Sequence, residues 1–406
     1  MQIADCELKK RTPEWVEPVE AFTEVAHEPG SVLLESQSGG GYSAIYTEPF
    51  EVLDSGSPFD ALKEALARRG SGGAVGYLGY ELHRFLEDSP ISTADDIGLP
   101  DHWLGLYDKA IVFDHHPHTA GYSIGNTPAK ADLISSFSKP DYIQAVERVK
   151  EHIAAGDVYQ VNLSQRFSVR MEMDPWELYL LLRERNPAPY AAYINAGDFQ
   201  IISSSPECFL TFDPISRVVT TRPIKGTRPR SADPAEDRRL AQELESSAKD
   251  MAENIMIVDL ERNDLGRVCE FGSVSVPELA MIESYPTVHH LVSTVTGRLR
   301  DDRDAVDLLT ATFPGGSITG APKIRVMEII AELEPVRRGV YTGSIGCLGF
   351  DGSVNLNIAI RTAVVKDGMC HFHVGGGIVA DSDPEAEYQE TLDKGRAFLE
   401  VLGCQM

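Results

Sequence analysis

The sequence predicts an α+β fold in which antiparallel strands and helices do not alternate regularly. Two Asp-Gly dipeptides, Asp351-Gly352 and Asp367-Gly368, are each flanked by apolar and β-branched residues. Such dipeptides are typical of tight β-hairpins, so we expect three consecutive antiparallel strands within residues 340–374. Helical periodicity occurs elsewhere in the chain, but without the strand–helix–strand rhythm of a parallel sheet.

The C-terminal segment is predicted to be a long helix. Asp383 can cap its first turn, and Pro384 suits the first helical position. Its apolar stripe recurs at three-and-four spacing and comprises Tyr388, Leu392, Gly395, Leu399 and Leu402. We therefore expect one face of this helix to be buried.

The middle of the chain contains further helices and strands. Residues 141–155 have an amphipathic pattern that Gly156 ends, and a strand is expected at 158–167. Residues 175–185 form the next expected helix. Residues 199–212 are predicted to form a hairpin around Ser205-Pro206.

The N-terminal third shows short strands and turns. We expect strands at 31–36 and 42–46 joined by Gly39-Gly40-Gly41, a helix at 58–69 and a strand at 72–80. The most polar connection lies at 129–139. We therefore divide the chain into an N-terminal region, 1–135, which belongs to the same fold, and a catalytic region, 136–406.

Composition narrows the class of protein. The 406 residues carry a net charge of −25, which disfavours nucleic acid and anionic membrane as partners. The six cysteines have no zinc or redox spacing, and no apolar run approaches the ~20 residues of a membrane span. The first residues carry acids where a signal peptide needs a basic and then an apolar run. We expect a cytoplasmic protein.

Two acidic pairs are candidate metal ligands. Asp250 and Glu253 are three residues apart in an expected helix, and so are Glu387 and Glu390 in the last helix. This spacing places each pair on one helix face. Oxygen ligands without His or Cys favour Mg²⁺. The alternative is two solvated helix faces.

Lys225 is the candidate nucleophile. It follows Pro223 closely and precedes Gly226, so we expect a shaped turn rather than a solvated tail. A lysine together with an acid such as Glu207 suggests nucleophilic and general-acid chemistry. The alternative reading of a lone loop lysine is a solvated charge.

Other polar positions suit an anionic substrate. Gly375-Gly376-Gly377 is expected to follow a strand directly and to offer backbone N–H groups to a carboxylate, with a tight strand exit as the alternative. The candidate side chains are Arg361 within a strand at 356–365, the hydroxyls of Ser317 and Thr319 in a substrate-covering loop, and His290. For Arg361 and His290 the alternatives are a solvated arginine and a satisfied histidine.

Together these motifs resemble the chorismate-utilising enzymes. The matching segments are 156–163, 186–190, 204–207, 222–227, 259–264, 313–317, 319–323, 375–382 and 387–391. They run in order from about residue 141 to the end, and the first 135 residues match loosely at 33–36 and 76–80. The resemblance implies antiparallel sheets packed face to face, with helices at the periphery.

The resemblance also implies residue roles. Lysine at Lys225 and glutamine at Gln160 match the branch that aminates chorismate at C4 to 4-amino-4-deoxychorismate. In that branch Lys225 attacks C2 and forms a covalent amine adduct, while Glu207 protonates the departing hydroxyl. Glu253 and Glu390 hold Mg²⁺, with Asp250 and Glu387 alongside. The implied substrate-binding residues are Tyr341, Arg361, Gly375, Gly377, Ser317, Thr319, Lys323, His290 and Gln160.

Three further implications concern partners and alternatives. No cysteine lies in a Gly-x-Cys-x-Gly glutaminase setting, so ammonia is expected from a separate glutaminase subunit. The nearest alternative is anthranilate synthase component I, whose members usually carry alanine at the position of Lys225. A non-catalytic amino-acid sensor is the other alternative. Possible tryptophan-binding residues are Leu34, Glu35, Ser36, Pro189 and Tyr190.

Overall fold

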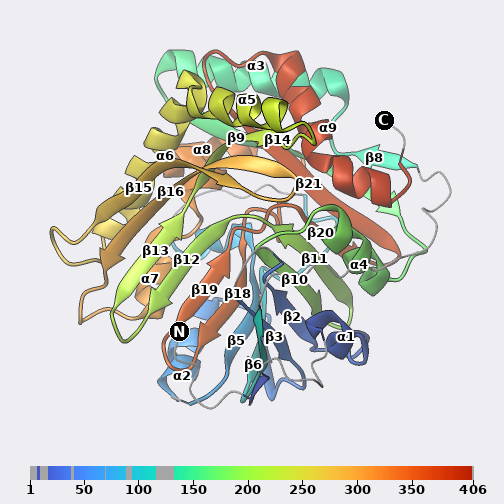
Figure 1. Ribbon diagram of the computed structural model, residues 1–406, viewed down its shortest axis with the longest axis vertical. Coiled ribbons are helices and arrows are strands. Elements are labelled where there is room, and N and C mark those ends of the chain that lie inside the picture. The colour runs from blue at the N-terminus through green and yellow to red at the C-terminus, as the bar shows by residue number, and fades with distance from the viewer. Residues whose placement is uncertain are drawn as a thin grey trace.

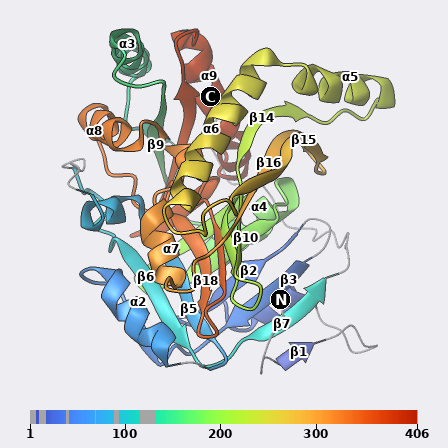
Figure 2. The ribbon, with the colours of Figure 1, turned by 90° about the vertical axis from the view of Figure 1, so that its left-hand side faces the viewer.

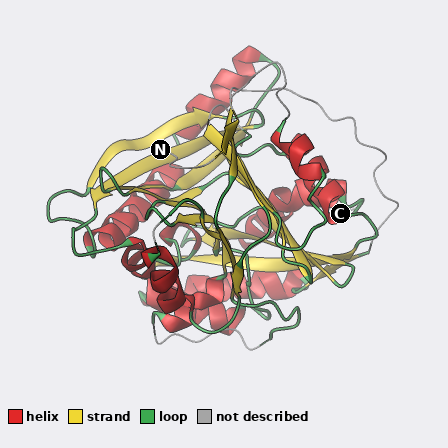
Figure 3. Cartoon of the chain, turned by 90° about the horizontal axis from the view of Figure 1, so that it is seen from below, coloured by secondary structure: helices red, strands yellow, loops and turns green. Residues whose placement is uncertain are grey.

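The computed structural model describes residues 7–9, 17–37, 41–68, 70–87, 94–115 and 132–404. The expected turn at Gly39-Gly40, the first residues and part of the expected linker at 129–131 lie outside these residues. Two large sheets form the body of the molecule (Figure 1). Figure 3 shows the strands running through the middle, with helices mainly outside them.

The first sheet is antiparallel except for one parallel edge pair, β1 with β7. In spatial order its strands are β1 (Glu7–Lys9), β7 (Ile111–His115), β3 (Gly41–Tyr46), β2 (Val32–Glu35), β10 (Tyr190–Asn195), β11 (Phe199–Ser205), β20 (Thr362–Lys366), β21 (Met369–Ile378), β9 (Gln160–Arg170) and β17 (Gly320–Ala321), with β8 (Leu133–Ser135) paired to β9.

The second sheet is antiparallel throughout its described strands. Its order is β14 (Ile224–Pro229), β16 (Val288–Arg298), β13 (Val218–Arg222), β12 (Cys208–Asp213), β19 (Val354–Asn357), β18 (Ser344–Gly349), β5 (Gly73–Leu78), β6 (His102–Tyr107) and β4 (Glu51–Leu53), with β15 (Ser275–Ser284) paired to β16. The N-terminal third therefore supplies strands to both sheets.

Helices cover the outer faces of the sheets (Figure 2). They are α1 (Pro18–Thr23), α2 (Pro58–Ala67), α3 (Lys139–Ala155), α4 (Pro175–Arg185), α5 (Pro234–Glu245), α6 (Ala248–Gly266), α7 (Ala305–Thr312), α8 (Lys323–Leu333) and α9 (Pro384–Val401), with 3₁₀ turns η1 (Tyr80–Phe85) and η2 (Gly316–Ile318). No described helix is long and apolar enough to cross a membrane.

Apolar side chains form several core clusters, of which three lie between or outside the two sheets. The central layer joins residues of both sheets, such as Ile201 of the first and Ile345 of the second. An outer layer packs α1, α4 and α9 on the first sheet, and another packs α2, α6 and α7 on the second. The expectation of an α+β fold with face-to-face antiparallel sheets and peripheral helices is confirmed.

Local sequence rules account for the helix ends and hairpins. The Asp383 side chain accepts the Ala386 N–H at 2.9 Å and begins α9, as expected. Gly156 ends α3 with φ 81°, a left-handed conformation that glycine adopts without a Cβ penalty. Both Asp-Gly dipeptides join paired strands, β18 with β19 and β20 with β21.

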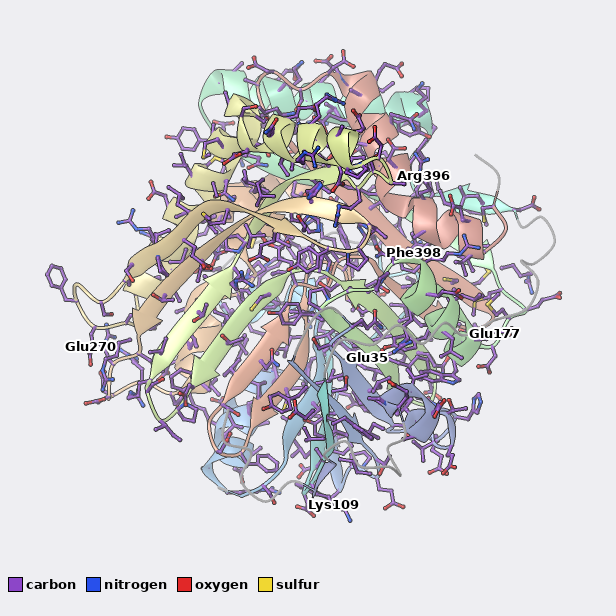
Figure 4. The ribbon with its side chains drawn as sticks, viewed as in Figure 1. Glu35, Lys109, Glu177, Glu270, Arg396 and Phe398 are labelled. Atoms are coloured by element: carbon purple, nitrogen blue, oxygen red, sulfur yellow. The ribbon has the colours of Figure 1, made fainter. Side chains whose placement is uncertain are left out.

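The last helix shows how burial follows the apolar stripe. Phe398 stacks on Phe372 of β21, with ring centroids 4.8 Å apart. Arg396, two residues earlier, points away from the sheet and is more than half exposed (Figure 4). The difference reflects the helical period, which separates neighbouring side chains by about 100°.

Two strand predictions are wrong in an informative way. Residues 199–212 do not form a hairpin, because β11 lies in the first sheet and β12 in the second. Residues 340–374 do not form three consecutive paired strands, because β19 lies in the second sheet and β20 in the first. Alternation of apolar residues identifies a strand but does not say which sheet receives it.

The triglycine prediction is also corrected. Gly375-Gly376-Gly377 does not follow a strand but lies inside β21, paired in register with Ser164, Leu163 and Asn162 of β9. A strand interior without side chains leaves room for other groups to approach the backbone closely.

Candidate active site

The candidate site begins where the chain crosses twice between the sheets. One crossing follows Ser205 and carries Glu207, and the other ends at Arg361. Ser205 Oγ donates to the Ile358 carbonyl at 2.5 Å, and the Ile358 N–H donates to the Glu207 carbonyl at 3.0 Å. The Ser204 N–H donates to the Arg361 carbonyl at 3.0 Å. These hydrogen bonds fasten the two crossings together.

Glu207 is a buried acid with few partners. It is 4% exposed, and the described residues place no cation within ion-pair distance of its carboxylate. Burial raises the pKa of Glu207, while a hydrogen bond with Ser317 and the charge of Lys225 oppose that rise. The Ile224 N–H approaches Glu207 Oε1 at 3.4 Å. A carboxyl whose pKa is raised by burial holds its proton more readily than a solvated one, which suits a general acid.

Lys225 lies on β14, facing the same site. Its ammonium donates to the Ser317 carbonyl at 2.7 Å and forms no ion pair with any described residue. Burial lowers the pKa of Lys225, and the Lys394 charge acts in the same direction against the carboxylates of Glu253, Glu207 and Glu390. A lowered pKa favours the neutral amine that a nucleophile needs.

The glycine after Lys225 is required by space and by conformation. Gly226 has φ 89°, and a Cβ there would lie 2.8 Å from Leu244 and 3.0 Å from Asp250. Lys225 was expected in a shaped turn, but it lies in the strand β14. Gly226 allows this strand to pack closely against α6, because a side chain there would collide with Asp250. This packing brings Lys225 next to the carboxylates of α6.

The residues of the expected substrate-covering loop make different contacts. Ser317 contacts Lys225 through its carbonyl and Glu207 through its side chain. The Thr319 hydroxyl is fully buried and donates to the Gly315 carbonyl at 3.0 Å, so it holds its own turn. Lys323 pairs with Asp264 at 2.6 Å and donates to the Thr312 carbonyl at 2.9 Å. Both side chains thus have partners within the fold, and substrate binding by Thr319 and Lys323 stays a prediction.

The triglycine segment forms a floor on which several predicted residues meet. A Cβ at Gly375 would lie 2.9 Å from Tyr341 Oη, and one at Gly377 would lie 1.8 Å from Gln160 Nε2. Gln160 is buried, and its Oε1 has no hydrogen-bond partner among the described residues. The absence of side chains on β21 is thus what brings Tyr341 and Gln160 to one surface.

The four carboxylates of the two acidic pairs lie in different local settings. Oxygens of Glu387 and Glu390 are both 3.3 Å from the point where a Gly376 Cβ would stand. Glu390 pairs with Lys394 at 2.7 Å, Glu387 accepts the Ser382 hydroxyl at 2.6 Å, and Asp250 pairs with Arg228 at 3.2 Å.

Carboxylates of the two helices influence one another electrostatically. Burial raises the pKa of Glu253, and the negative charges of Asp250 and Glu390 add to that rise. Burial likewise raises the pKa of Glu387, to which Glu390 again contributes. Lysines oppose these effects: Lys225 and Lys249 lower the pKa of Glu253, and Lys394 lowers that of Glu390. Carboxylate oxygens gathered in this way are the ligands that a hard divalent cation prefers.

A metal centre with several protein ligands is nevertheless not formed. Within the part of the chain that the structure describes, no three His, Cys, Asp or Glu side chains are close enough to hold an ion together. The donor set fits Mg²⁺ in its chemistry, because Mg²⁺ commonly takes one or two carboxylates plus waters and an acidic ligand.

Arg361 and His290 flank the same region. Arg361 has φ 51° at the second crossing, rather than the strand geometry predicted for it, and it forms no ion pair with a described residue. Burial lowers its pKa. His290 Nδ1 lies 2.8 Å from Thr227 Oγ1, and burial followed by the Arg361 charge lowers the pKa of His290 to about 4. A part-buried guanidinium without an ion pair among the described residues can receive a carboxylate.

A small cavity lies behind Tyr341. Its volume of about 30 Å³ has room for roughly two water molecules. It is lined by Tyr341, His371 and His373 and by the paired Arg166 and Asp96.

The segments expected to bind tryptophan lie side by side. Glu35 of β2 pairs with Ala191 of β10, next to Tyr190, and the Gln37 N–H donates to the Ala188 carbonyl at 3.1 Å. Leu34 packs into the core between the sheets, whereas Glu35 contacts Arg183 of α4 at 2.8 Å. Leu34 and Glu35 thus point to opposite faces of the sheet, while Ser36 and Pro189 are partly buried. Tryptophan binding stays a prediction.

Two residues near the site were given no role from the sequence, although Lys394 shares a helix face with Glu387 and Glu390. Lys394 donates to the Gly375 carbonyl at 2.8 Å and pairs with Glu390, so a cation stands among the predicted metal ligands. Its position four residues after Glu390 was a usable signal. Glu261, buried behind the Ser317 turn, gave no periodic signal because it lies in a charged run of α6.

Comparison with known proteins agrees with this geometry. Residues 42–400 match the family model described as chorismate binding enzyme. The chain is 47% identical to aminodeoxychorismate synthase component 1 of Escherichia coli (strain K12) over 350 residues, covering 82% of this chain and 77% of that protein. It is 41% identical to anthranilate synthase component 1 of Streptomyces coelicolor over 441 residues, covering 95% and 86%.

Solved structures give the same result. The anthranilate synthase component I from Streptococcus pneumoniae superposes with a TM-score of 0.77 at 33% identity, covering 96% of this chain and 99% of that one. The isochorismate synthase MenF of Escherichia coli, at 18% identity and a TM-score of 0.75, shares the fold. The chain belongs to the chorismate binding enzyme family.

Proposed function

We propose that this enzyme aminates chorismate at C4 with ammonia and releases 4-amino-4-deoxychorismate and water. The observation that carries the proposal is Lys225. It is a part-buried lysine without an ion pair among the described residues, held by the Ser317 carbonyl 2.7 Å away, in a site that also holds Glu207, an acid whose pKa burial raises.

The first step uses both groups. The neutral Lys225 amine attacks C2 of chorismate, the ring double bonds shift, and the C4 oxygen leaves as water with the proton of Glu207. The new C2–N bond is a covalent amine adduct. The Glu207 carboxylate then remains buried beside the cationic adduct, which offsets its charge.

The second step restores the enzyme. Ammonia attacks C4, the double bonds shift back, and the C2–N bond to Lys225 breaks with return of the electron pair to the lysine nitrogen. Glu207 recovers a proton from the incoming ammonia. The sum is chorismate plus ammonia giving 4-amino-4-deoxychorismate plus water, with the enolpyruvyl group retained.

Substrate binding is assigned to the groups around the triglycine floor. Arg361 and Tyr341 would bind the enolpyruvyl carboxylate, with backbone near Gly375 and Gly377. Glu253 and Glu390 would hold Mg²⁺, with Asp250 and Glu387 alongside. When bound, Mg²⁺ supplies a positive charge for the ring carboxylate, which the carboxylates alone would repel.

Ammonia is proposed to come from a separate glutaminase subunit. The sequence holds no Gly-x-Cys-x-Gly motif, and the relatives cited above are named as component 1 of their enzymes. We place the reaction in the cytoplasm, in keeping with the absence of disulfides among the described cysteines. The chain alone should use ammonium but not glutamine.

Anthranilate synthase is the second candidate, favoured by the Streptomyces coelicolor relative that covers 95% of the chain. Chromatography of a reaction containing chorismate, ammonium, Mg²⁺ and this chain separates the two. We expect 4-amino-4-deoxychorismate, with turnover rising at alkaline pH because NH₃ is the reactive species. Anthranilate with pyruvate as the main products would overturn the proposal.

A further inference from the structure

Glu261 is a buried acid that the proposed reaction does not yet use. It lies on α6, is 2% exposed, and accepts the Gly316 N–H at 3.1 Å through Oε1. Its other oxygen, Oε2, is buried without a hydrogen-bond partner among the described residues. A carboxyl with so few partners is a costly group to keep in a core, so a compensating role is worth seeking.

The turn that Glu261 holds touches both catalytic groups. Gly316 begins the single turn η2, and the next residue, Ser317, accepts the Lys225 ammonium at 2.7 Å. The Ser317 side chain also hydrogen-bonds the Glu207 carboxyl. A Cβ at Gly316 would stand 3.1 Å from Glu261 Oε1 and 2.7 Å from Leu260. The turn is therefore pressed against α6, with Glu261 as its polar anchor.

The charged surroundings of Glu261 come from three elements. Asp264 lies one turn further along α6, Lys323 comes from α8 and pairs with Asp264, and Glu207 comes from the first crossing. Burial, and then the Asp264 charge, raise the pKa of Glu261, so its surroundings favour the neutral carboxyl. A neutral carboxyl can accept from Gly316 without placing a second negative charge beside Glu207.

We propose that Glu261 is a positioning residue for the amination: by anchoring the Gly316–Ile318 turn to α6 it sets where Ser317 holds Lys225 and Glu207. This inference rests on the proposed function for the chemistry that those two groups perform. Glu261 acts through Ser317 and does not touch the reacting atoms. Its loss would leave the Gly316 N–H buried without an acceptor and allow the turn to shift.

Three variants test the proposal. E261Q keeps an acceptor oxygen for Gly316, E261L removes it at similar size, and D259N removes one exposed carboxylate from the same helix. Turnover and KM for chorismate are measured with ammonium and Mg²⁺, and the rate of the Lys225 adduct is followed by intact mass without ammonia.

We expect E261L to lower kcat and the adduct rate together by about tenfold or more, because small displacements of reacting groups are costly. KM for chorismate should change by less than about threefold, since Arg361 and Tyr341 are untouched. E261Q should recover most of the loss, and D259N should behave as the wild type. Circular dichroism and unfolding curves identify any variant that fails to fold, and E261Q remains informative if E261L does.

The proposal is overturned if E261L has wild-type kcat and adduct rate, or if E261Q is as slow as E261L. It is also overturned if E261L raises KM alone. A failure of the proposed function looks different: the wild type itself would then form no adduct or would release anthranilate. In that case the kcat ratio of E261L to E261Q still reports whether the turn needs its anchor.

Discussion

Two buried glutamates, Glu35 and Glu207, show how the same residue type takes opposite roles in this molecule. Glu35 is 3% exposed and Glu207 is 4% exposed, and both lie at or next to the ends of strands of the first sheet. Glu35 lies inside the molecule, whereas Glu177 and Glu270 lie at its edges (Figure 4).

The partners of the two glutamates differ. The Glu35 carboxylate accepts two hydrogen bonds from the Arg183 guanidinium, at 2.8 and 2.9 Å. It also accepts one from the Tyr179 hydroxyl at 2.5 Å. Glu207 has a hydrogen bond with the Ser317 side chain and a long contact from the Ile224 N–H, and it forms no ion pair with a described residue. A fully satisfied carboxylate stabilises a fold, whereas an under-satisfied one keeps its proton and can give it away.

The largest expected effect on turnover comes from removing the proposed Mg²⁺, which neither Glu35 nor Glu207 binds. E253K should abolish turnover while the fold persists, because a lysine at this place repels Mg²⁺ and substrate charge balance is lost. Excess chelator should do the same to the wild type. D259K, on the exposed face of the same helix, is the control. Full activity in chelator would exclude the assignment of a metal to Glu253 and Glu390.

The second-largest expected effect comes from replacing Glu207, the proposed proton donor of the two glutamates. E207Q should lower kcat by about 100-fold or more, the usual contribution of a general acid, with KM for chorismate little changed. Its melting temperature should not fall, because burial already disfavours the charged form of Glu207. Steady-state kinetics and calorimetry check this, and near-normal turnover would show that Glu207 does not donate the proton.

Removing the cation that pairs with Glu35 should instead lower stability and leave turnover nearly unchanged. R183M leaves Glu35 buried without its cation, and we expect a loss of about 3 kcal/mol in the free energy of unfolding. The folded fraction should keep kcat within about threefold, since α4 supplies none of the site residues. Urea unfolding with matched kinetics measures both. R183M/E35Q should regain part of the stability, and no regain would mean that the pair is not coupled.

The smallest expected effect is a change of melting temperature with pH. It would show that Glu261, like Glu207, has a pKa raised by burial. Burial raises the pKa of Glu261 from 4.5 to about 8 in the folded state. The stabilisation from its neutral form is fully present below pH 4.5 and is lost as pH rises through 8. The melting temperature of E261Q minus that of the wild type should therefore grow by about 2–4 °C between pH 5 and 8. A flat difference would show that Glu261 is ionised throughout.

The sequence predicted the elements better than their connections. The caps of α9 and α3 and both Asp-Gly hairpins depend on residues a few positions apart, so local rules find them. The crossings at Glu207 and Arg361 depend on which sheet receives the next strand. That choice is made by burial between distant segments, and neighbouring residues carry no trace of it.

The site shows the same division. Lys225 and the acidic pairs were visible as motifs, and the structure gathers Lys225, Glu207, Glu253 and Glu390 within electrostatic reach of one another. Lys323 and Thr319 were assigned to the substrate, yet their contacts are with Asp264 and Gly315. Which residues contact one another depends on the folded structure. A sequence motif can therefore identify a polar residue without showing what that residue binds.

The central claim is that Lys225 is a nucleophile. Its lowered pKa and its lack of an ion pair support that role over a passive positive charge. K225R keeps the charge but forms no amine adduct at neutral pH, and K225A removes both. We expect the two variants to lose kcat by a similar factor, about 100-fold or more.

Intact-mass analysis with chorismate and without ammonia tests this claim most directly. The account predicts that the wild type gains the mass of chorismate less one water, and that peptide mapping places the gain on Lys225. K225R and K225A should gain nothing. If the wild type never carries the adduct and K225R turns over at a near-normal rate, Lys225 acts only through its charge and the covalent mechanism is wrong.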